Sequence, residues 1–178
     1  NFRKGMLWRR GCLPFEGRDQ LYLEIEKYQQ AAVMDSDPAA LATVFAFGES
    51  SSYFTELKAK HIEKLLNYVQ APRGSKHDGR IFLNSGVVLR DGLLVIRDTS
   101  KSNDYLVKAW QAGENWATVV LARNYVMIND YRNAYLWSLR CLGYCNRDAD
   151  IELRYLQKHL TPGQVLAIQA AAKDMAII

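Results

Sequence analysis

The feature that most constrains this chain is a succession of helical patterns whose contact positions carry small side chains. Residues 107–122 read VKAWQAGENWATVVLA, and two helical patterns meet there at Gly113. A self-sufficient amphipathic helix would more often place leucine at its apolar positions, but this segment has Ala109, Ala112, Ala117 and Ala122. Small side chains let helix axes approach closely, so the pattern predicts helices stacked on helices.

Helical spacing of apolar residues continues through almost the whole chain. We expect helices at about 19–34, 38–47, 52–70, 80–89, 100–112, 115–128, 130–144, 148–159 and 161–176. In the first of these, the stripe predicted to face the core is Leu21, Ile25, Tyr28 and Ala32. Because no alternating segment could pair with LLVI as a strand, residues 90–99 are interpreted as a loop whose apolar residues tuck into the helix layer.

Local signals agree with these helices. Asp37 before Pro38 favours a helix start, and Thr161 with Gln164 forms a predicted capping box. Connections are short, which predicts antiparallel helical hairpins. The expected fold class is all-α.

Composition and charge exclude several functional classes. The chain has 178 residues and a formal net charge of +4, and its basic and acidic residues alternate without a basic stripe, so a nucleic-acid partner is not expected. No apolar run approaches the ~20 residues of a membrane span. The chain begins at Asn1 and not Met, so we expect that an upstream segment was removed, which leaves an exported origin open.

Three cysteines, an odd number, cannot all pair with one another: Cys12, Cys141 and Cys145. Cys141 and Cys145 share a helix face, and the preferred interpretation is buried free cysteines at a helix contact. A disulfide from Cys12 would instead require an oxidising compartment. A zinc site with His159 lacks a second closely spaced ligand pair.

The chain also repeats itself. SNDYLVKAWQAG (102–113) can be placed over YRNAYLWSLRCLG (131–143), with a period of 30 that stretches to 32 between Ala117 and Ala149. One hairpin cannot bury its apolar face alone, so repeated hairpins stack on one another. The positions that define the repeat are Gly86, Gly92, Ala109, Gly113, Ala117, Ala122 and Gly143.

With Leu89, Val95, Asp98, Tyr105 and Lys108, this pattern resembles the Sel-one-like repeat, a solenoid family related to tetratricopeptide repeats. Residues 117–143 resemble a further copy, and LTPGQVLAIQ resembles the helix that closes such arrays. The resemblance implies a right-handed α-solenoid of antiparallel helical hairpins. We therefore expect one domain over 1–178, with atypical helices at 1–80, repeats at 81–160 and a C-terminal capping helix at 161–178.

No catalytic constellation, cofactor motif or metal site is recognisable, so we expect no enzymatic activity, no cofactor and no metal. His61 lies on an inward stripe and is interpreted as a satisfied core histidine. The concave face of a solenoid is its default contact surface, and the residues expected to point outward there are Asn84, Arg90, Asn115, Arg123, Asn124 and Met127. The loop at 71–79 is a second candidate contact.

The resemblance implies a protein-binding scaffold. The first expectation is a bacterial immunity protein that neutralises a secreted effector or toxin, in the periplasm or associated with the envelope. The alternative is an adaptor, in the cytoplasm or periplasm, that joins signalling or envelope proteins. A homo-oligomeric structural protein is the third class, and the sequence does not fix the oligomeric state.

Overall fold

The computed structural model describes residues 18–46, 52–141 and 152–174, and every regular element in these ranges is an α-helix. The elements are α2 (Arg18–Met34), α3 (Pro38–Val44), α4 (Ser52–Tyr68), α5 (Asp78–Asp91), α6 (Thr99–Gln111), α7 (Trp116–Met127), α8 (Tyr131–Arg140), α9 (Leu153–Gln157) and α10 (Pro162–Ala172). The predicted all-α class is confirmed for the described part of the chain.

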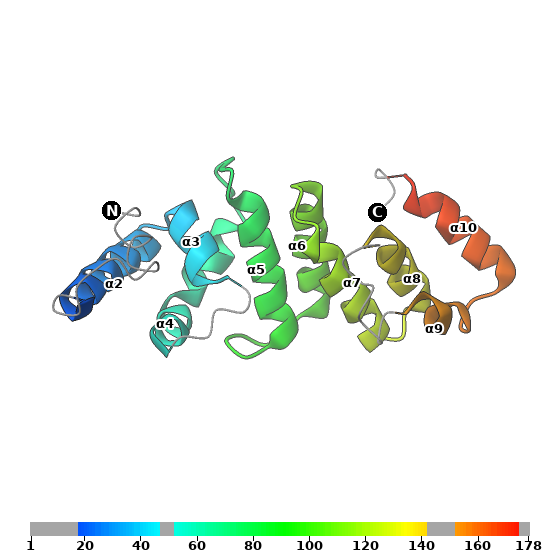
Figure 1. Cartoon of the computed structure of the whole chain (residues 1–178), viewed down its shortest axis with the longest axis horizontal. Coiled ribbons are helices and arrows are strands. Elements are labelled where there is room, and N and C mark those ends of the chain that lie inside the picture. The colour runs from blue at the N-terminus through cyan, green and yellow to red at the C-terminus, as the bar shows by residue number, and fades with distance from the viewer. Residues whose placement is uncertain (1–17, 47–51, 142–151, 175–178) are drawn as a thin grey trace.

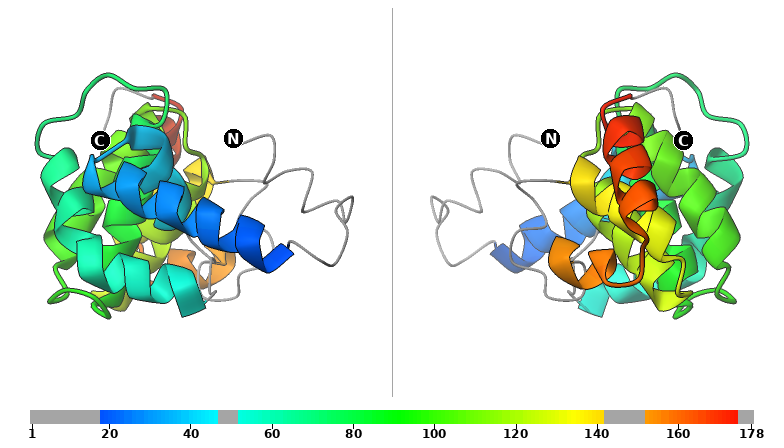
Figure 2. Two further views of the ribbon diagram at one scale, coloured as in Figure 1. Left: turned by 90° about the vertical axis from the view of Figure 1, so that its left-hand side faces the viewer. Right: turned by 90° about the vertical axis from the view of Figure 1, so that its right-hand side faces the viewer.

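The helices stand in a row along the long axis of the molecule, from α2 at one end to α10 at the other (Figure 1). Substantial contacts join helices that follow one another in sequence or that are separated by one helix, such as α3 with α5 and α5 with α7. In the end-on views of Figure 2 the central helices overlap behind one another. The chain is therefore held together mainly by contacts between neighbouring helices.

One hydrophobic cluster runs from Val33 at the end of α2 to α8, and a smaller one joins α8, α9 and α10 around Tyr135, Leu156 and Ile168. In the larger cluster Trp110 and Trp137 meet edge to face, with ring centroids 5.0 Å apart. The guanidinium of Arg140 lies 4.7 Å from the Trp110 ring and 4.8 Å from the Trp137 ring. This cation–π contact joins α6 to α8.

The tightest helix contact lies between α5 and α6, and it depends on Gly86. A Cβ atom added to Gly86 would lie 2.6 Å from Cγ of Leu106 and 3.1 Å from the carbonyl oxygen of Ser102. Leu106 is fully buried, so it has no room to move away. Ala109, Ala117 and Ala122 are fully buried as well. At these repeat positions, small residues do permit close packing; Gly143 lies outside the described residues.

Buried polar side chains connect helices α5, α6 and α7. Asn124 of α7 donates hydrogen bonds to Ser102 Oγ (3.1 Å) and Asn103 Oδ1 (2.7 Å) of α6, and the Ser102 hydroxyl donates to the carbonyl of Gly86 in α5 (2.7 Å). All of these side chains are buried. Because an unpaired buried polar group is costly, this network favours one relative register of α5, α6 and α7.

Three turns between consecutive helices, which we call corners, have the same backbone geometry. At Gly113, the amide N–H groups of Gly113 and Glu114 donate to the carbonyls of Trp110 and Ala109, which is a Schellman motif. Ser36 and Asn129 occupy the equivalent left-handed position after α2 and α7, with φ of 53° and 60°. Each corner ends one helix and starts another within a few residues.

Several helix starts are as predicted. The side chains of Asp37 and Thr161 accept hydrogen bonds from the backbone, and the capping box of Thr161 with Gln164 is present. Asp98 and Asp130 cap α6 and α8 in the same way, and they are 32 residues apart. This separation equals the longer of the two spacings, 30 and 32, that the sequence analysis found between similar segments.

Two side chains differ from expectation. Tyr28 is 62% exposed, so its predicted place on a core-facing stripe is wrong. Among the α2 side chains that the structure describes, Val33 is the buried one. His61 has non-helical backbone angles that kink α4, and its buried Nε2 has no hydrogen-bond partner. His61 is therefore not the satisfied core histidine that its position in the sequence suggested.

Cys141 is fully buried, as expected, but it is disulfide-bonded. The prediction of a free thiol at this position is therefore wrong. Cys12 and Cys145, the two other cysteines of the chain, lie outside the described residues.

Candidate partner-binding surface

Two of the six predicted contact residues are buried, and their expected exposure is wrong. Asn124 belongs to the network described above, and Asn84 donates a hydrogen bond from Nδ2 to the carbonyl of Ala42 in α3, at 3.1 Å. Both amides therefore connect helices within the row. Polar character suggested a surface position, but partners from distant helices satisfy these donors inside the core.

Arg90 has an intermediate position at the end of α5. Its guanidinium contacts the neighbouring Asp91 through Nε (2.8 Å) and Nη2 (2.7 Å), and only 17% of its side chain is exposed. A partner that used Arg90 would first have to compete with this ion pair. We therefore assign Arg90 a supporting role at most.

The other three predicted residues, Asn115, Arg123 and Met127, are exposed along α7. Every residue of α7 from Ala117 to Ala122 is buried, so its exposed side chains are Trp116 at its start and Arg123 and Met127 in its second half. The sequence analysis did not select Trp116, but it lies on the same side of α7 as Arg123 and Met127. Residues 116 and 123 are about two helical turns apart, and residues 123 and 127 are about one turn apart. We call the set Asn115, Trp116, Arg123 and Met127 the α7 stripe.

The α7 stripe contains two partly exposed apolar side chains and one arginine. Trp116 is 37% exposed and Met127 is 49% exposed, and Arg123 lies between them. Tyr125 is only partly exposed, and burial, followed by the nearby Asp130 carboxylate, raises the pKa of its hydroxyl. Near neutral pH Tyr125 is therefore a neutral neighbour of the stripe. The helix spacing of Trp116 with Arg123 was available in the sequence and could have identified the tryptophan.

A second exposed surface was not expected. The α5–α6 loop, residues 92–97, exposes Leu93 by 86% and Ile96 by 93%. The structure confirms a loop between these helices, but it is shorter than the predicted 90–99, because Arg90 and Asp91 belong to α5 and Thr99 to α6. The side chains of Leu93 and Ile96 do not tuck into the helix layer. Apolar content alone had suggested burial, and the sequence offered no signal that the loop would point away from the helices.

The other candidate loop, residues 71–79, is anchored by hydrogen bonds within the same chain. The Tyr68 hydroxyl donates to Asp78 Oδ1 at 2.7 Å, and Asp78 Oδ2 accepts from the amide of Gly74 at 3.0 Å. Burial and this hydrogen bond to the carboxylate raise the pKa of Tyr68. The loop exposes mainly polar residues and carries no large apolar side chain, so it is the weaker candidate.

Within the described residues, no group of three His, Cys, Asp or Glu side chains is placed to hold a metal ion. In the same part of the chain, no helix has the length and apolar character of a membrane span. A scan of protein-family models, a search of curated proteins and a search of solved structures each found no match to this chain.

Proposed function

We propose that this chain is a non-catalytic protein-binding scaffold, built as a right-handed α-solenoid, whose α7 stripe contacts a partner protein. The observation that carries the proposal is the exposure of Trp116, Arg123 and Met127 on one side of a helix whose residues 117–122 are all buried. Tryptophan and arginine are the residues most enriched at energetic hot spots of protein interfaces, and methionine is enriched in interfaces generally.

The solenoid part of the proposal is supported by the way in which the helices contact one another. Neighbour-to-neighbour contacts, equivalent aspartate caps at Asp98 and Asp130, and recurring Schellman corners are the properties of stacked hairpins. A rigid helix within such a stack holds its exposed side chains in fixed positions. Preorganisation of this kind reduces the entropy lost on binding.

The proposed kind of partner rests on the resemblance to the Sel-one-like repeat. The preferred proposal is a bacterial immunity protein that neutralises a secreted effector or toxin; the second is an adaptor for signalling or envelope proteins. The disulfide at Cys141 supports an oxidising compartment such as the periplasm, because cytosolic thiols are normally kept reduced. This favours the first proposal over a cytoplasmic adaptor.

Site-specific photo-crosslinking in the native host tests the proposed contact. A photoreactive residue at Met127 should give one dominant protein adduct, identified by mass spectrometry, and the same residue at exposed Lys60 of α4 should not. An effector or toxin as the adduct would support the immunity role, and several envelope or signalling proteins would support the adaptor. Adducts of equal yield from both positions would contradict the assignment of the α7 stripe.

Binding measurements with the captured partner sharpen the test. Trp116→Ala and Arg123→Glu should each weaken affinity by about tenfold to a hundredfold, which corresponds to roughly 1.4–3 kcal/mol. Lys27→Glu, a charge reversal on exposed α2, is the matched control and should change affinity by less than about twofold. Melting temperatures should confirm that all three variants remain folded.

A further inference from the structure

The α5–α6 loop has a chemistry different from that of the α7 stripe. Its consecutive residues Leu93, Leu94, Val95 and Ile96 are all aliphatic, and the two at its ends are the most exposed large apolar side chains among the described residues. None of the four side chains can form a hydrogen bond. Leucine and valine are under-represented at hot spots of protein interfaces. The loop therefore offers apolar volume without the directional contacts that specify a protein partner.

The exposed position of this loop is enforced by contacts at its base. Gly92 ends α5 in the left-handed conformation, with φ of 69°, and its amide donates to the carbonyl of Val88. The Asp98 amide donates across the base of the loop to the carbonyl of Leu89, at 3.1 Å. A Cβ atom on Gly92 would lie 3.0 Å from Cβ of Arg97, so the two ends of the loop touch. The loop is thus fixed in a shape that points its apolar residues outward.

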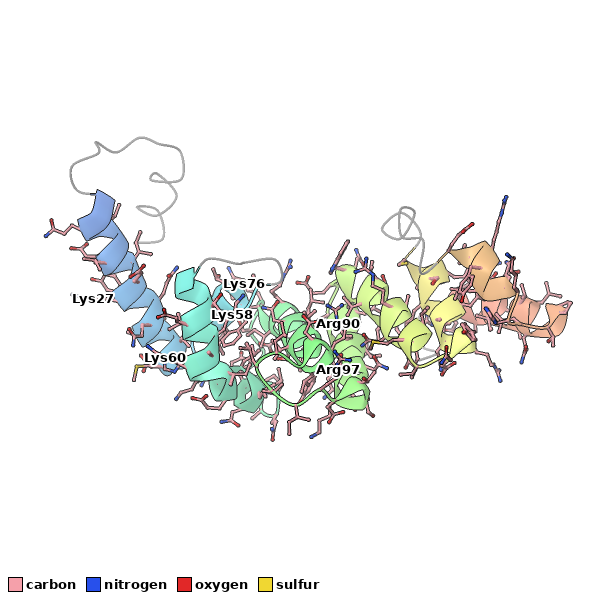
Figure 3. All side chains as sticks on the ribbon, turned by 90° about the horizontal axis from the view of Figure 1, so that it is seen from below. Lys27, Lys58, Lys60, Lys76, Arg90 and Arg97 are labelled. Atoms are coloured by element: carbon pink, nitrogen blue, oxygen red, sulfur yellow. The ribbon has the colours of Figure 1, made fainter. Side chains whose placement is uncertain are left out.

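Another exposed apolar side chain lies at the same edge of the molecule. Because α5 and α7 run in the same direction, the α5–α6 loop and the turn after α7 lie at the same edge of the row, the lower edge in Figure 1. Ile128, half exposed, lies in that second turn. Figure 3 looks onto this edge and labels Arg90 and Arg97 at the α5–α6 turn.

Charge at the loop favours an anionic surface. Between residues 90 and 101 there are three basic residues, Arg90, Arg97 and Lys101, and two acidic ones, Asp91 and Asp98. Asp91 is paired with Arg90 and Asp98 with Lys101, whereas the exposed Arg97 contacts a backbone carbonyl, that of Asp91, at 3.4 Å. One cationic group therefore lies directly next to exposed Ile96.

We infer that the α5–α6 loop docks the protein on an anionic lipid surface, with Leu93 and Ile96 entering the interface and Arg97 beside the headgroups. Lipid accepts aliphatic side chains without a complementary pocket, and interfacial binding grows with buried apolar area and with attraction to anionic lipids. This is peripheral docking by a loop, and it does not depend on the partner proposed for the α7 stripe.

Vesicle flotation of the purified chain tests the inference. The probes are phosphatidylcholine vesicles with and without about 30% phosphatidylglycerol, a content that provides the negative surface potential of anionic membranes. The chain should float with the anionic vesicles and bind the neutral ones less. The double variant Leu93→Ser/Ile96→Ser should weaken binding at least about tenfold, and Arg97→Glu should reduce binding to the anionic vesicles specifically.

The matched control removes two other exposed leucines, with the variant Leu23→Ser/Leu166→Ser on α2 and α10. This variant should keep vesicle affinity within about twofold of the original. The inference is overturned if the original chain does not bind anionic vesicles, or if the control variant loses as much binding as the loop variant. Photo-crosslinking from Ile96 to a protein, without any vesicle binding, would assign the loop to a protein contact and also overturn the inference.

Discussion

Helices α5 and α2 have similar lengths, but their environments are opposite. In α5, Ile81 to Val87 are all buried, because α3, α6 and α7 surround the helix. In α2, Val33 is the buried residue among those whose side chains are described, and Leu23, Tyr28 and Met34 are exposed. The difference lies in the number of neighbouring helices: α5 stands in the middle of the row and α2 at its end.

This comparison shows what a helical pattern in a stack does and does not encode. Periodicity predicts that a helix forms, and small residues predict close contact with a neighbour. How much of a helix becomes buried depends on how many partners stack on it, which is a property of position in the row. Substitutions in the centre should therefore be costly, and matched substitutions at the end should be tolerated.

The largest effect is expected for Gly86→Val in the centre. The added side chain would overlap Leu106 and the Ser102 carbonyl, and overpacking of this kind should reduce the free energy of unfolding by about 3 kcal/mol. Urea denaturation measures the change. Gly163→Ala, at the start of α10, is the control, because its Cβ atom would meet nothing within 4 Å. Equal losses from both variants would show that Gly86 is not a close-packed position.

The next effect is expected for Asn124→Ala. This change removes the hydrogen bonds to Ser102 and Asn103 and leaves the Asn103 acceptor buried without a donor, so it should cost about 2 kcal/mol. Asn67→Ala on exposed α4 should cost less than about 0.5 kcal/mol. Thermal unfolding of the two variants tests the network. If Asn124→Ala and Asn67→Ala unfold at the same temperature, the buried amide of Asn124 does not stabilise the central helices.

Smaller effects of opposite sign are expected at two corners. Gly113→Ala places a Cβ on a residue with φ of 92° and should destabilise by about 1 kcal/mol, through backbone strain and not overpacking, because no atom lies within 4 Å. Ser36 has a positive φ that glycine adopts without strain, so Ser36→Gly should raise the free energy of unfolding by up to about 1 kcal/mol. Denaturant midpoints of the two variants should move in opposite directions; a shift of both in one direction would contradict the corner assignment.

The smallest effect is expected for Leu23→Ser on α2. Its side chain is mostly exposed, so the free energy of unfolding should change by less than about 0.5 kcal/mol. Leu65→Ser on α4 is the comparison, because Leu65 is fully buried and should cost several kcal/mol. A large loss from Leu23→Ser in denaturation experiments would show that α2 has a partner in solution that covers this face.

The sequence predicted the features that depend on neighbours along the chain. The caps at Asp37 and Thr161 were recognisable because a cap is formed by a side chain and a backbone amide only three residues away. Gly86 was selected as a repeat position for a similar reason, because the spacing between residues of one helical hairpin can be found directly in the sequence. The α7 stripe was found in part, through Asn115, Arg123 and Met127.

The sequence did not predict features that depend on distant partners. Asn84 finds its acceptor 42 residues away, and Asn124 finds its acceptors 21 and 22 residues away, so polarity alone misplaced both on the surface. Leu93 and Ile96 were predicted to be buried because they are apolar, but both are exposed. Contacts at the base of the loop, which no periodicity reveals, hold these residues outside.

The contact pattern of the row also has a consequence for folding kinetics. Because each helix contacts mainly its neighbours in sequence, few contacts require the closure of a long loop. Such local topology is associated with rapid folding. Helices α5 and α6 share the close contact at Gly86, and only residues 92–98 separate them, so their pairing requires the closure of a short loop.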